Sequence, residues 1–270
     1  MMRLGCCFLT DVGKLRKNNE DNFYCNGNYK ENPDDLVYEK IDLIYGGGIF
    51  AVCDGMGGEE YGEKASLLAV ETLKEFEETD INKTIDEYVN AANEKICDLI
   101  TENNGTRSGT TLALVYIKDG YANCYNIGDS RIYLIRNKKI QQISEDHTRS
   151  MQMIKMGILT KEQAMNHKDR HVLTQHMGIF PDELIIQAYK SEPIKIKNKD
   201  VILLCSDGLT DMVSDDEIIN IICNDMSSEE SAELLIKAAL ENGGKDNVTV
   251  GVIKNIEEKE NFFKKIWRKR

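Results

Sequence analysis

Apolar side chains recur at steps of three and four after the polar pair Thr79-Asp80, which can cap the start of a helix. This spacing predicts a long amphipathic helix that ends near Asn103-Asn104-Gly105, with apolar positions at Ile85, Tyr88, Val89, Ala92, Ile96, Leu99 and Ile100. The same period predicts three shorter helices, through Leu67 to Phe76, through Ile218 to Ile222, and through Ala232 to Ala239 before Gly243-Gly244.

Short apolar runs between turn residues predict strands. Residues 112–117 and 121–127 flank Lys118-Asp119-Gly120, and residues 132–135 and 140–143 flank Asn137-Lys138. We also expect a buried strand over 201–204 and a last strand through Val248, Val250 and Val252. Hairpins together with paired helices favour an α+β fold over a repeated βαβ pattern. There is no internal repeat and no linker before about Ile256, so we expect one domain over residues 1–256.

Two segments have weaker patterns. Residues 150–182 are polar, contain Met and His and show little periodicity, so we expect a mobile flap beside a site. Residues 27–48 begin at Asn26-Gly27, contain Pro33 and end in Gly46-Gly47-Gly48, and we expect them to form a surface hairpin.

Composition and charge narrow the function. The chain has 270 residues, of which 41% are hydrophobic and 30% charged, as is typical of a globular protein. Acidic residues outnumber basic ones by 46 to 34, a net charge of −12, which argues against nucleic-acid binding and suits a protein that concentrates divalent cations. There is no apolar run of about 18 residues and no signal-peptide pattern. The 8 cysteines have no C-x-x-C spacing, so we expect reduced thiols and a cytoplasmic location.

Acidic residues stand beside glycine at the ends of apolar runs. Asp54, Asp129 and Asp207 each follow such a run, and Asp246 comes just before the last strand. Any one of them could be a simple turn, as we expect for Asp119-Gly120. Four together predict a carboxylate cluster, whose members would repel one another unless divalent cations neutralise them. Oxygen ligands favour Mg²⁺ or Mn²⁺ over zinc, and no EF-hand loop is present.

The segment from Thr10 to Phe23 adds further charged groups. Arg16 offers a planar fork of donors for a phosphate, although an arginine taken alone is more often a solvated surface charge. The adjacent Glu20 and Asp21 offer further metal ligands. We therefore include this segment in the candidate site.

These motifs resemble those of the metal-dependent protein phosphatases of type 2C (the PPM family), particularly the compact bacterial members, in the same order over about residues 4–253. The matching runs are Asp11 to Asp21, Asp54-Gly55-Met56-Gly57-Gly58, Ser108-Gly109-Thr110-Thr111, Ile127 to Arg131, Glu145 to Thr148, Cys205 to Leu209 and Gly244 to Thr249. The resemblance implies an antiparallel β-sandwich flanked by helix pairs, in α-β-β-α layers. It also implies a binuclear metal centre in a cleft at one end.

Matching positions imply a role for each candidate residue. Asp54 corresponds to the carboxylate that bridges two metals, and the carbonyl of Gly55 binds one of them. Asp207 and Asp246 correspond to ligands of the first metal.

The resemblance implies that Asp21, or Glu20 beside it, holds the second metal directly or through water. Of the two, we favour Asp21. Asp129 corresponds to the acid that, with Asp207, holds a weaker third metal. Arg16 corresponds to the phosphate-binding arginine.

The resemblance implies hydrolysis of phosphoserine and phosphothreonine in proteins by direct attack of a metal-bridging water, opposed by a cognate Ser/Thr kinase. Met56 stands where eukaryotic members often carry a proton-donating His, and Glu59 stands where His is common. The leaving oxygen must then be protonated by metal-bound water or by another group, for which His147 is a candidate. There is no C-x₅-R loop of the cysteine phosphatases.

Two other interpretations are open. A phosphatase-like module that binds phosphoproteins without turnover would not need its metal ligands, yet Asp54, Asp207 and Asp246 are all present. A phosphatase of the sporulation and stress-response type usually has extra sensor domains, for which we find no room.

Residues 257–270 form a basic and aromatic tail, with Phe262, Phe263 and Trp267 among lysines and arginines. We expect a solvated, disordered segment. The alternative is a weak contact with an anionic membrane surface through the aromatic and basic side chains.

Overall fold

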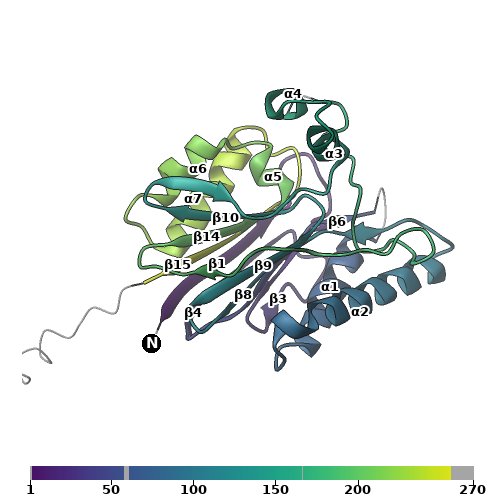
Figure 1. The fold of residues 1–270 in the computed structure, drawn as a ribbon, viewed down its shortest axis with the longest axis horizontal. Helices are drawn as coiled ribbons and strands as arrows, with labels where there is room; N and C mark the ends of the chain where they lie inside the picture. The colour runs from purple at the N-terminus through teal and green to yellow at the C-terminus, as the bar shows by residue number, and fades with distance from the viewer. Residues whose placement is uncertain (1, 58–60, 166, 257–270) are drawn as a thin grey trace, which may run out of the picture.

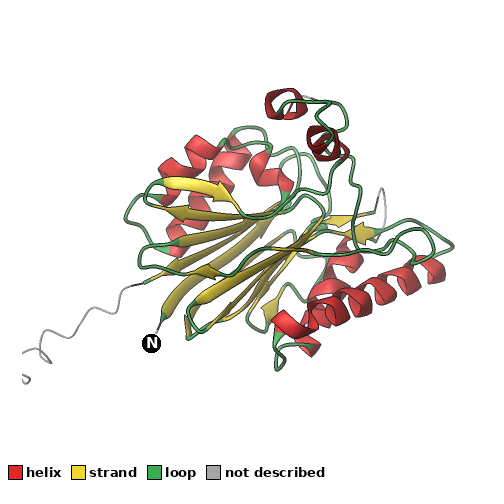
Figure 2. Ribbon diagram, viewed as in Figure 1, coloured by secondary structure: helices red, strands yellow, loops and turns green. Residues whose placement is uncertain are grey.

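The structure, a computed structural model, describes residues 2–57, 61–165 and 167–256. Two antiparallel sheets face each other (Figures 1 and 2). The six-stranded sheet has the order β11 (Lys139–Gln142), β10 (Arg131–Arg136), β14 (Val201–Cys205), β15 (Val248–Asn255), β1 (Arg3–Asp11) and β4 (Val37–Tyr45). The seven-stranded sheet has the order β12 (Tyr189–Lys190), β9 (Tyr121–Ile127), β8 (Leu112–Lys118), β5 (Gly48–Cys53), β2 (Asn22–Cys25) and β3 (Asn28–Tyr29), and β13 (Ile194–Lys195) also pairs with β9.

Helix pairs cover the outer face of each sheet (Figure 2). Helices α1 (Gly62–Glu75) and α2 (Ile81–Glu102) pack on the seven-stranded sheet, and α6 (Asp215–Ile222) and α7 (Ser228–Glu241) pack on the other. Helices α6 and α7 each begin with a capping box, in which a serine and a glutamate satisfy backbone donors reciprocally. The predicted α-β-β-α layering is therefore confirmed. Among the described residues, no helix is long and apolar enough to cross a membrane.

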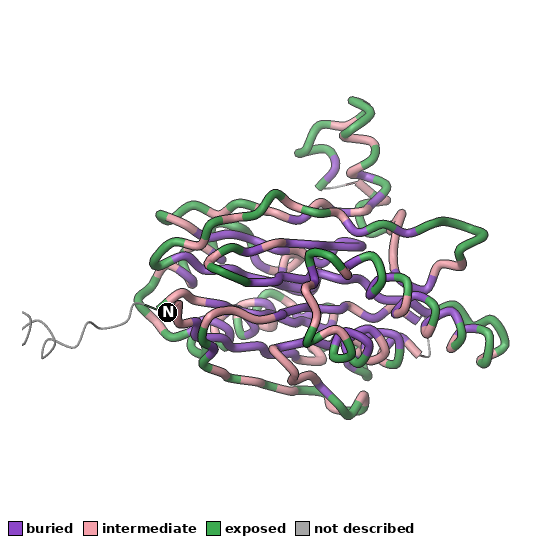
Figure 3. Tube along the Cα trace, turned by 60° about the horizontal axis from the view of Figure 1, so that its bottom comes forward, coloured by how far each residue is buried: buried purple, intermediate pink, exposed green. Residues whose placement is uncertain are grey.

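The apolar layer between the sheets aligns their strands. The ring centroids of Phe8 and Phe23 lie 5.4 Å apart, and those of Phe8 and Phe50 lie 6.0 Å apart. All three side chains are fully buried, and each contributes about 1.5–3 kcal/mol through removal of apolar surface from water. Burial follows the strands through the centre of the molecule (Figure 3). A rigid core of this kind fixes the strand ends, where the acidic residues lie.

The predicted hairpins are present. Asp119 and Gly120 both have positive φ, 51° and 80°, as do Asn137 and Lys138, 53° and 58°. Two such residues match the turn to the twist of the flanking strands. All eight cysteines are free thiols, and seven of them are buried.

Residues 27–48 do not form the surface hairpin that the sequence suggested. Strand β3 belongs to the seven-stranded sheet, whereas β4 pairs with β1 over nine residues at the edge of the other sheet. The side chains of β4 alternate between exposed and partly buried, as expected for an edge strand with one open face. The segment therefore links the two sheets, and β1 itself was not predicted.

Residues 150–182 include two short helices, α3 (Arg149–Lys155) and α4 (Lys161–Met165), that stand beside one end of the sandwich (Figure 1). The chain returns through an isolated bridge between Thr148 and Leu173. This segment, here called the flap, lies next to the candidate site. Its predicted mobility stays a prediction.

Candidate metal centre

The loop after β5 carries Asp54 in a fixed backbone position. The N–H of Thr111 donates to the carbonyl of Asp54 at 2.9 Å, and the N–H of Asp54 donates to the Thr111 hydroxyl at 2.9 Å. The Thr110 hydroxyl donates to the same carbonyl at 3.0 Å. Thr110 and Thr111, the last two residues of the Ser108-Gly109-Thr110-Thr111 motif, therefore anchor the main chain of Asp54 and leave its carboxylate to the site.

Gly55 and Gly208 allow close backbone approaches around the site. A Cβ at Gly55 would lie 2.3 Å from the carbonyl oxygen of Glu20, and one at Gly208 would lie 1.9 Å from that of Asn247. Any side chain would push these segments apart. The glycines beside the acids are therefore required for packing, and their mere presence is weaker evidence for ligand binding than the sequence suggested.

Five aspartates from different strand ends converge at one end of the sandwich: Asp21, Asp54, Asp129, Asp207 and Asp246. Burial raises the pKa of Asp54 well above its ordinary value, and the charges of the other four raise it further. The pKa of Asp129 rises to about 8, mainly through burial and then through Asp207. These mutual effects mean that the five carboxylates lie close together, with Asp21 and Asp129 buried and Asp207 and Asp246 partly exposed.

The residues present fit divalent cations. Buried carboxylates stay ionised only where positive charge compensates them, and oxygen donors are those that Mg²⁺ and Mn²⁺ prefer. The Oδ1 atom of Asp21 is buried and has no hydrogen-bond partner. A buried acceptor without a donor is costly, and a cation nearby would satisfy it.

Asp21 and Glu20 differ in their surroundings. Asp21 is 1% exposed, and its Oδ2 accepts hydrogen bonds from the hydroxyls of Ser206 at 2.8 Å and Thr249 at 2.7 Å. Burial raises its pKa to about 7 although both hydrogen bonds oppose the rise. Glu20 is half-buried, and its pKa is raised by burial and by Glu63. Asp21 therefore lies deep beneath the cluster, and Glu20 lies nearer to solvent.

Arg16 lies against the site. Its Nη2 donates to Oδ2 of Asp246 at 2.7 Å, and about half of the arginine side chain is exposed. This hydrogen bond is the main cause of the raised pKa of Arg16. The guanidinium keeps donors that face solvent, so it can bind an anion at the mouth of the cluster.

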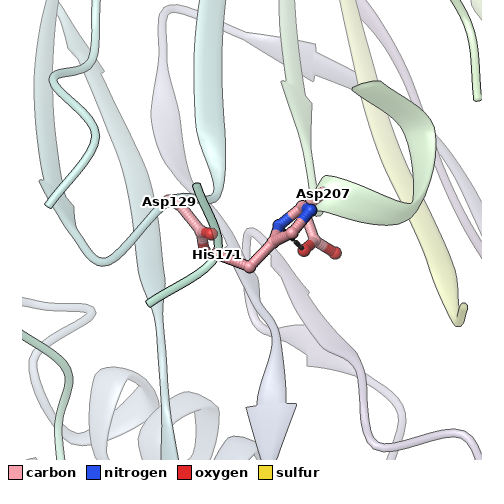
Figure 4. Close-up of side chains that lie close together, drawn as sticks. All are labelled: Asp129, His171 and Asp207. Atoms are coloured by element: carbon pink, nitrogen blue, oxygen red, sulfur yellow. Dashed lines mark ion pairs between the residues drawn. The ribbon is translucent and has the colours of Figure 1, made fainter. Parts of the chain in front are cut away.

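Asp129 and Asp207 meet a histidine that the sequence did not single out (Figure 4). Nδ1 of His171 lies 3.4 Å from Oδ2 of Asp207, and its Nε2 lies 3.1 Å from Oδ2 of Asp211. The hydrogen bonds to these two carboxylates raise the pKa of His171 to about 10. The only sequence signal was the polar, His-containing character of the flap.

His147 lies beside the turn that carries Asp129. The ring Nδ1 of His147 accepts a hydrogen bond from the backbone N–H of Gly128 at 3.3 Å. The backbone N–H of His147 donates to the carbonyl of Gly128 at 2.9 Å. Burial lowers the pKa of the ring. A neutral imidazole in this position supports the turn that carries Asp129.

Arg131 and Asp146 form a second support that the sequence did not identify. Nε and Nη2 of Arg131 both donate to Asp146, at 3.0 Å and 2.7 Å to its Oδ2. Gln142 donates to the other carboxylate oxygen at 2.6 Å. This pair, in which Asp146 is buried and Arg131 is partly exposed, lies directly beside the turn at residues 128–130.

Clustered carboxylates, of which Asp21 and Asp129 are buried and the others partly exposed, beside an exposed arginine are the arrangement expected of a metal-dependent enzyme that acts on phosphate esters. A family model described as protein phosphatase 2C matches residues 34–242, and the chain belongs to that family. Protein phosphatase PhpP of Streptococcus pneumoniae is 34% identical to this chain, over 93% of this chain and 97% of PhpP. Serine/threonine phosphatase stp of Listeria welshimeri is 32% identical, over 93% of this chain and 96% of stp.

Solved structures agree with this assignment. The catalytic domain of serine/threonine protein phosphatase PstP in complex with two manganese ions is 29% identical, with a TM-score of 0.77, over 95% of this chain and all of that one. The S. agalactiae serine/threonine phosphatase superposes with a TM-score of 0.80 over 94% of this chain and all of that one, at 27% identity. The expected family, fold and enzymatic nature are confirmed, and the chain is a metal-dependent phosphatase.

Proposed function

We propose that this phosphatase removes phosphate from phosphoserine and phosphothreonine in proteins, using Mn²⁺ or Mg²⁺. The observation that carries the proposal is the convergence of four other aspartates on Asp54, with the Arg16 guanidinium at the edge of the cluster. The names of the matched relatives and the two manganese ions of the PstP catalytic domain support it.

We assign the metal ligands by position. Asp54 would hold two cations, the Gly55 carbonyl would be a further ligand of one of them, and Asp207 and Asp246 would complete the first site. Asp21 or Glu20 would hold the second, directly or through water, and the orphaned Oδ1 of Asp21 supports Asp21. Asp129 would hold a weaker third cation with Asp207. Bound cations would lower the pKa of water and offset charge on the phosphoryl group, which is the chemistry that direct hydrolysis requires.

The other residues bind and position the substrate. Arg16 holds phosphate oxygens with donors not used by Asp246. Met56 can give no proton to the leaving oxygen. His147 already accepts a hydrogen bond from Gly128, so we assign it to holding Asp129 in place rather than to acid catalysis.

Partners and location follow from this activity. A Ser/Thr protein kinase must supply the phosphoproteins, and a cytoplasmic location suits free thiols at all eight cysteines. We assign residues 1–256 to the phosphatase domain. The basic aromatic tail lies outside the described residues, and the weak membrane contact proposed for it predicts binding to anionic vesicles that is lost on deleting residues 261–270.

Hydrolysis of matched phosphothreonine and phosphotyrosine peptides, with Mn²⁺ and with chelator, tests the function. We expect release of phosphate from the phosphothreonine peptide only when Mn²⁺ is present. Activity that survives complete chelation would overturn the metal-dependent assignment. Metal-dependent binding of the peptide without phosphate release would favour the non-catalytic module instead.

A further inference from the structure

A pocket of about 500 Å³ opens beside the carboxylate cluster, on the side away from the flap helices. It begins at Met56 and Gly57, two and three residues after Asp54, and its walls include Ile100 of α2 and Ile179, Phe180 and Leu184 from the chain after the flap helices. We call this cavity the Met56 pocket. Its walls combine five large apolar side chains with a few polar ones, Arg107, Ser108, His176 and Glu183, whereas the side of the site around His171 is lined mostly by charged and polar residues.

The backbone of the Met56 pocket is continuous with that of the metal centre. Strand β6 (Gly55–Met56) pairs with β7 (Gly109–Thr110), and Thr110 exchanges backbone hydrogen bonds with Met177 at 3.0 and 2.9 Å. Asn93 of α2 then donates to the carbonyl of Ile179 at 2.9 Å and accepts from the N–H of Gly178 at 2.7 Å. The far wall is therefore held at a fixed position relative to Asp54.

Ser108 gives the Met56 pocket an unused polar group. The residue is 4% exposed, lines the pocket, and its hydroxyl has no hydrogen-bond partner. A buried hydroxyl without a partner is unfavourable, and a bound molecule that offers a donor or acceptor would relieve this cost. At the mouth, Arg107 forms only a loose ion pair with Glu183, at 3.5 Å, and is 87% exposed.

The distance from the reacting centre fits a peptide. Two residues of extended chain, such as those from Asp54 to Met56, span about 7 Å. A substrate side chain one or two positions from a phosphorylated residue lies at a similar distance from its phosphate. An apolar wall and a buried polar group together are what a side chain with its flanking peptide bond requires.

We propose that the Met56 pocket binds a bulky apolar side chain, such as Leu or Phe, one or two positions from the phosphorylated residue, with the Ser108 hydroxyl bonded to the peptide backbone. The inference rests on the proposed function. It means that the Met56 pocket determines which substrate sequences the enzyme prefers. Small phosphate esters, which have no peptide flanks, do not use it.

Two phosphothreonine peptides, one with Leu and one with Gly at the neighbouring positions, test the inference alongside p-nitrophenyl phosphate. We expect kcat/KM to be about tenfold higher for the Leu peptide, mostly through KM, as is usual for one buried apolar group. Leu184→Asp, at the 40% exposed rim, should remove this preference without changing hydrolysis of p-nitrophenyl phosphate. Ser108→Ala should lower kcat/KM for both peptides severalfold and spare the small ester.

Ile185→Asp is the matched control, because Ile185 is 74% exposed and does not line the Met56 pocket. It should keep the full preference. Equal kcat/KM for the two peptides with the wild-type protein, or an unchanged preference in Leu184→Asp, would overturn the inference while leaving the proposed function intact. Failure of the wild-type protein to hydrolyse any of the three substrates with Mn²⁺ would instead overturn the proposed function and this inference with it.

Discussion

The side chain of Asn247 is hydrogen-bonded to the backbone of Glu20 across 227 residues of sequence, its Oδ1 accepting from the N–H of Glu20 at 2.8 Å. Its Nδ2 donates to the carbonyls of Val12 and Asn18, both at 2.9 Å. One buried amide therefore fixes both ends of the loop that carries Arg16, beside Asp246. The position of the phosphate-binding candidate depends on a residue that takes no part in the chemistry.

Asn247→Ala should destabilise the protein by about 2–4 kcal/mol, because three backbone groups lose their hydrogen bonds to the Asn247 side chain. It should also raise KM, because the Arg16 loop is released. Urea unfolding and steady-state kinetics measure the two effects. Asn255→Ala is the control at the other end of β15, where one exposed hydrogen bond to Lys197 is lost. A similar change in both variants would contradict the role given to Asn247.

Asp54→Asn should fold normally but lose at least about a hundredfold in hydrolysis rate, equivalent to roughly 2.7 kcal/mol in the barrier. The amide keeps the size of the carboxylate, but it removes the charge and one anionic oxygen that two cations share. Circular dichroism and hydrolysis of p-nitrophenyl phosphate at saturating Mn²⁺ test this. Near wild-type activity in a folded variant would refute the assigned role of Asp54.

Asp129→Ala should leave two tight metal sites in place and lower turnover of phosphopeptides, because we assign Asp129 only to the weaker third site. Calorimetric titration with Mn²⁺ counts the tight sites directly. Asp119→Ala, in a hairpin turn away from the cluster, is the control for added apolar character and lost charge. If the titration of Asp129→Ala shows that the tight sites are gone, the assignment is wrong.

Stability of the metal-free protein should fall as pH rises from 5.5 to 8.5. Folding raises the pKa of Asp21 from 3.8 to about 7 and that of Asp129 from 3.8 to about 8. Folding therefore favours the protonated forms of both carboxyl groups. Their contribution to the free energy of unfolding is fully present below about pH 3.8 and is lost as pH rises through the folded-state pKa values. Mn²⁺ binds the deprotonated forms, so it should raise the melting temperature more at pH 8.5 than at 5.5.

Thermal unfolding at the two pH values, with and without Mn²⁺, measures this dependence. Asp129→Asn should flatten the slope of the metal-free protein, because one of the titrating groups is gone. The same increase in melting temperature with Mn²⁺ at both pH values would show that these carboxylates do not compete with protons for the cation.

Asp54, Asp129 and Asp207 could be predicted from sequence because each follows an apolar strand and stands next to a glycine. Asp246 and Asp21 have weaker signals, because each comes before a strand. Strands β1 and β4 could not be predicted from sequence, because the alternation of apolar and polar side chains is weak in these segments and β4 is mostly exposed. His171 had no local signal, because its partners Asp207 and Asp211 come from another part of the chain.

Lys30 illustrates the same limit. It lies in the segment expected to be a surface hairpin, yet its side chain is fully buried and its Nζ donates to the carbonyl of Asn19 at 2.7 Å. A lysine is rarely buried, and only acceptors supplied by the folded backbone make this position tolerable. The sequence carries no trace of such an arrangement.

The pairing of β1 with β15 has a consequence for protein synthesis. Leu4 pairs with Asn255 and Asp11 pairs with Val248. The first strand to be synthesised therefore cannot complete its pairing until the last strand has been made. At typical elongation rates that wait lasts tens of seconds, during which β4 can already pair with β1 but Asp246 and Thr249 have not been made. We therefore expect a nascent chain to be unable to assemble the metal centre, and so to remain inactive, until its final strand has left the ribosome.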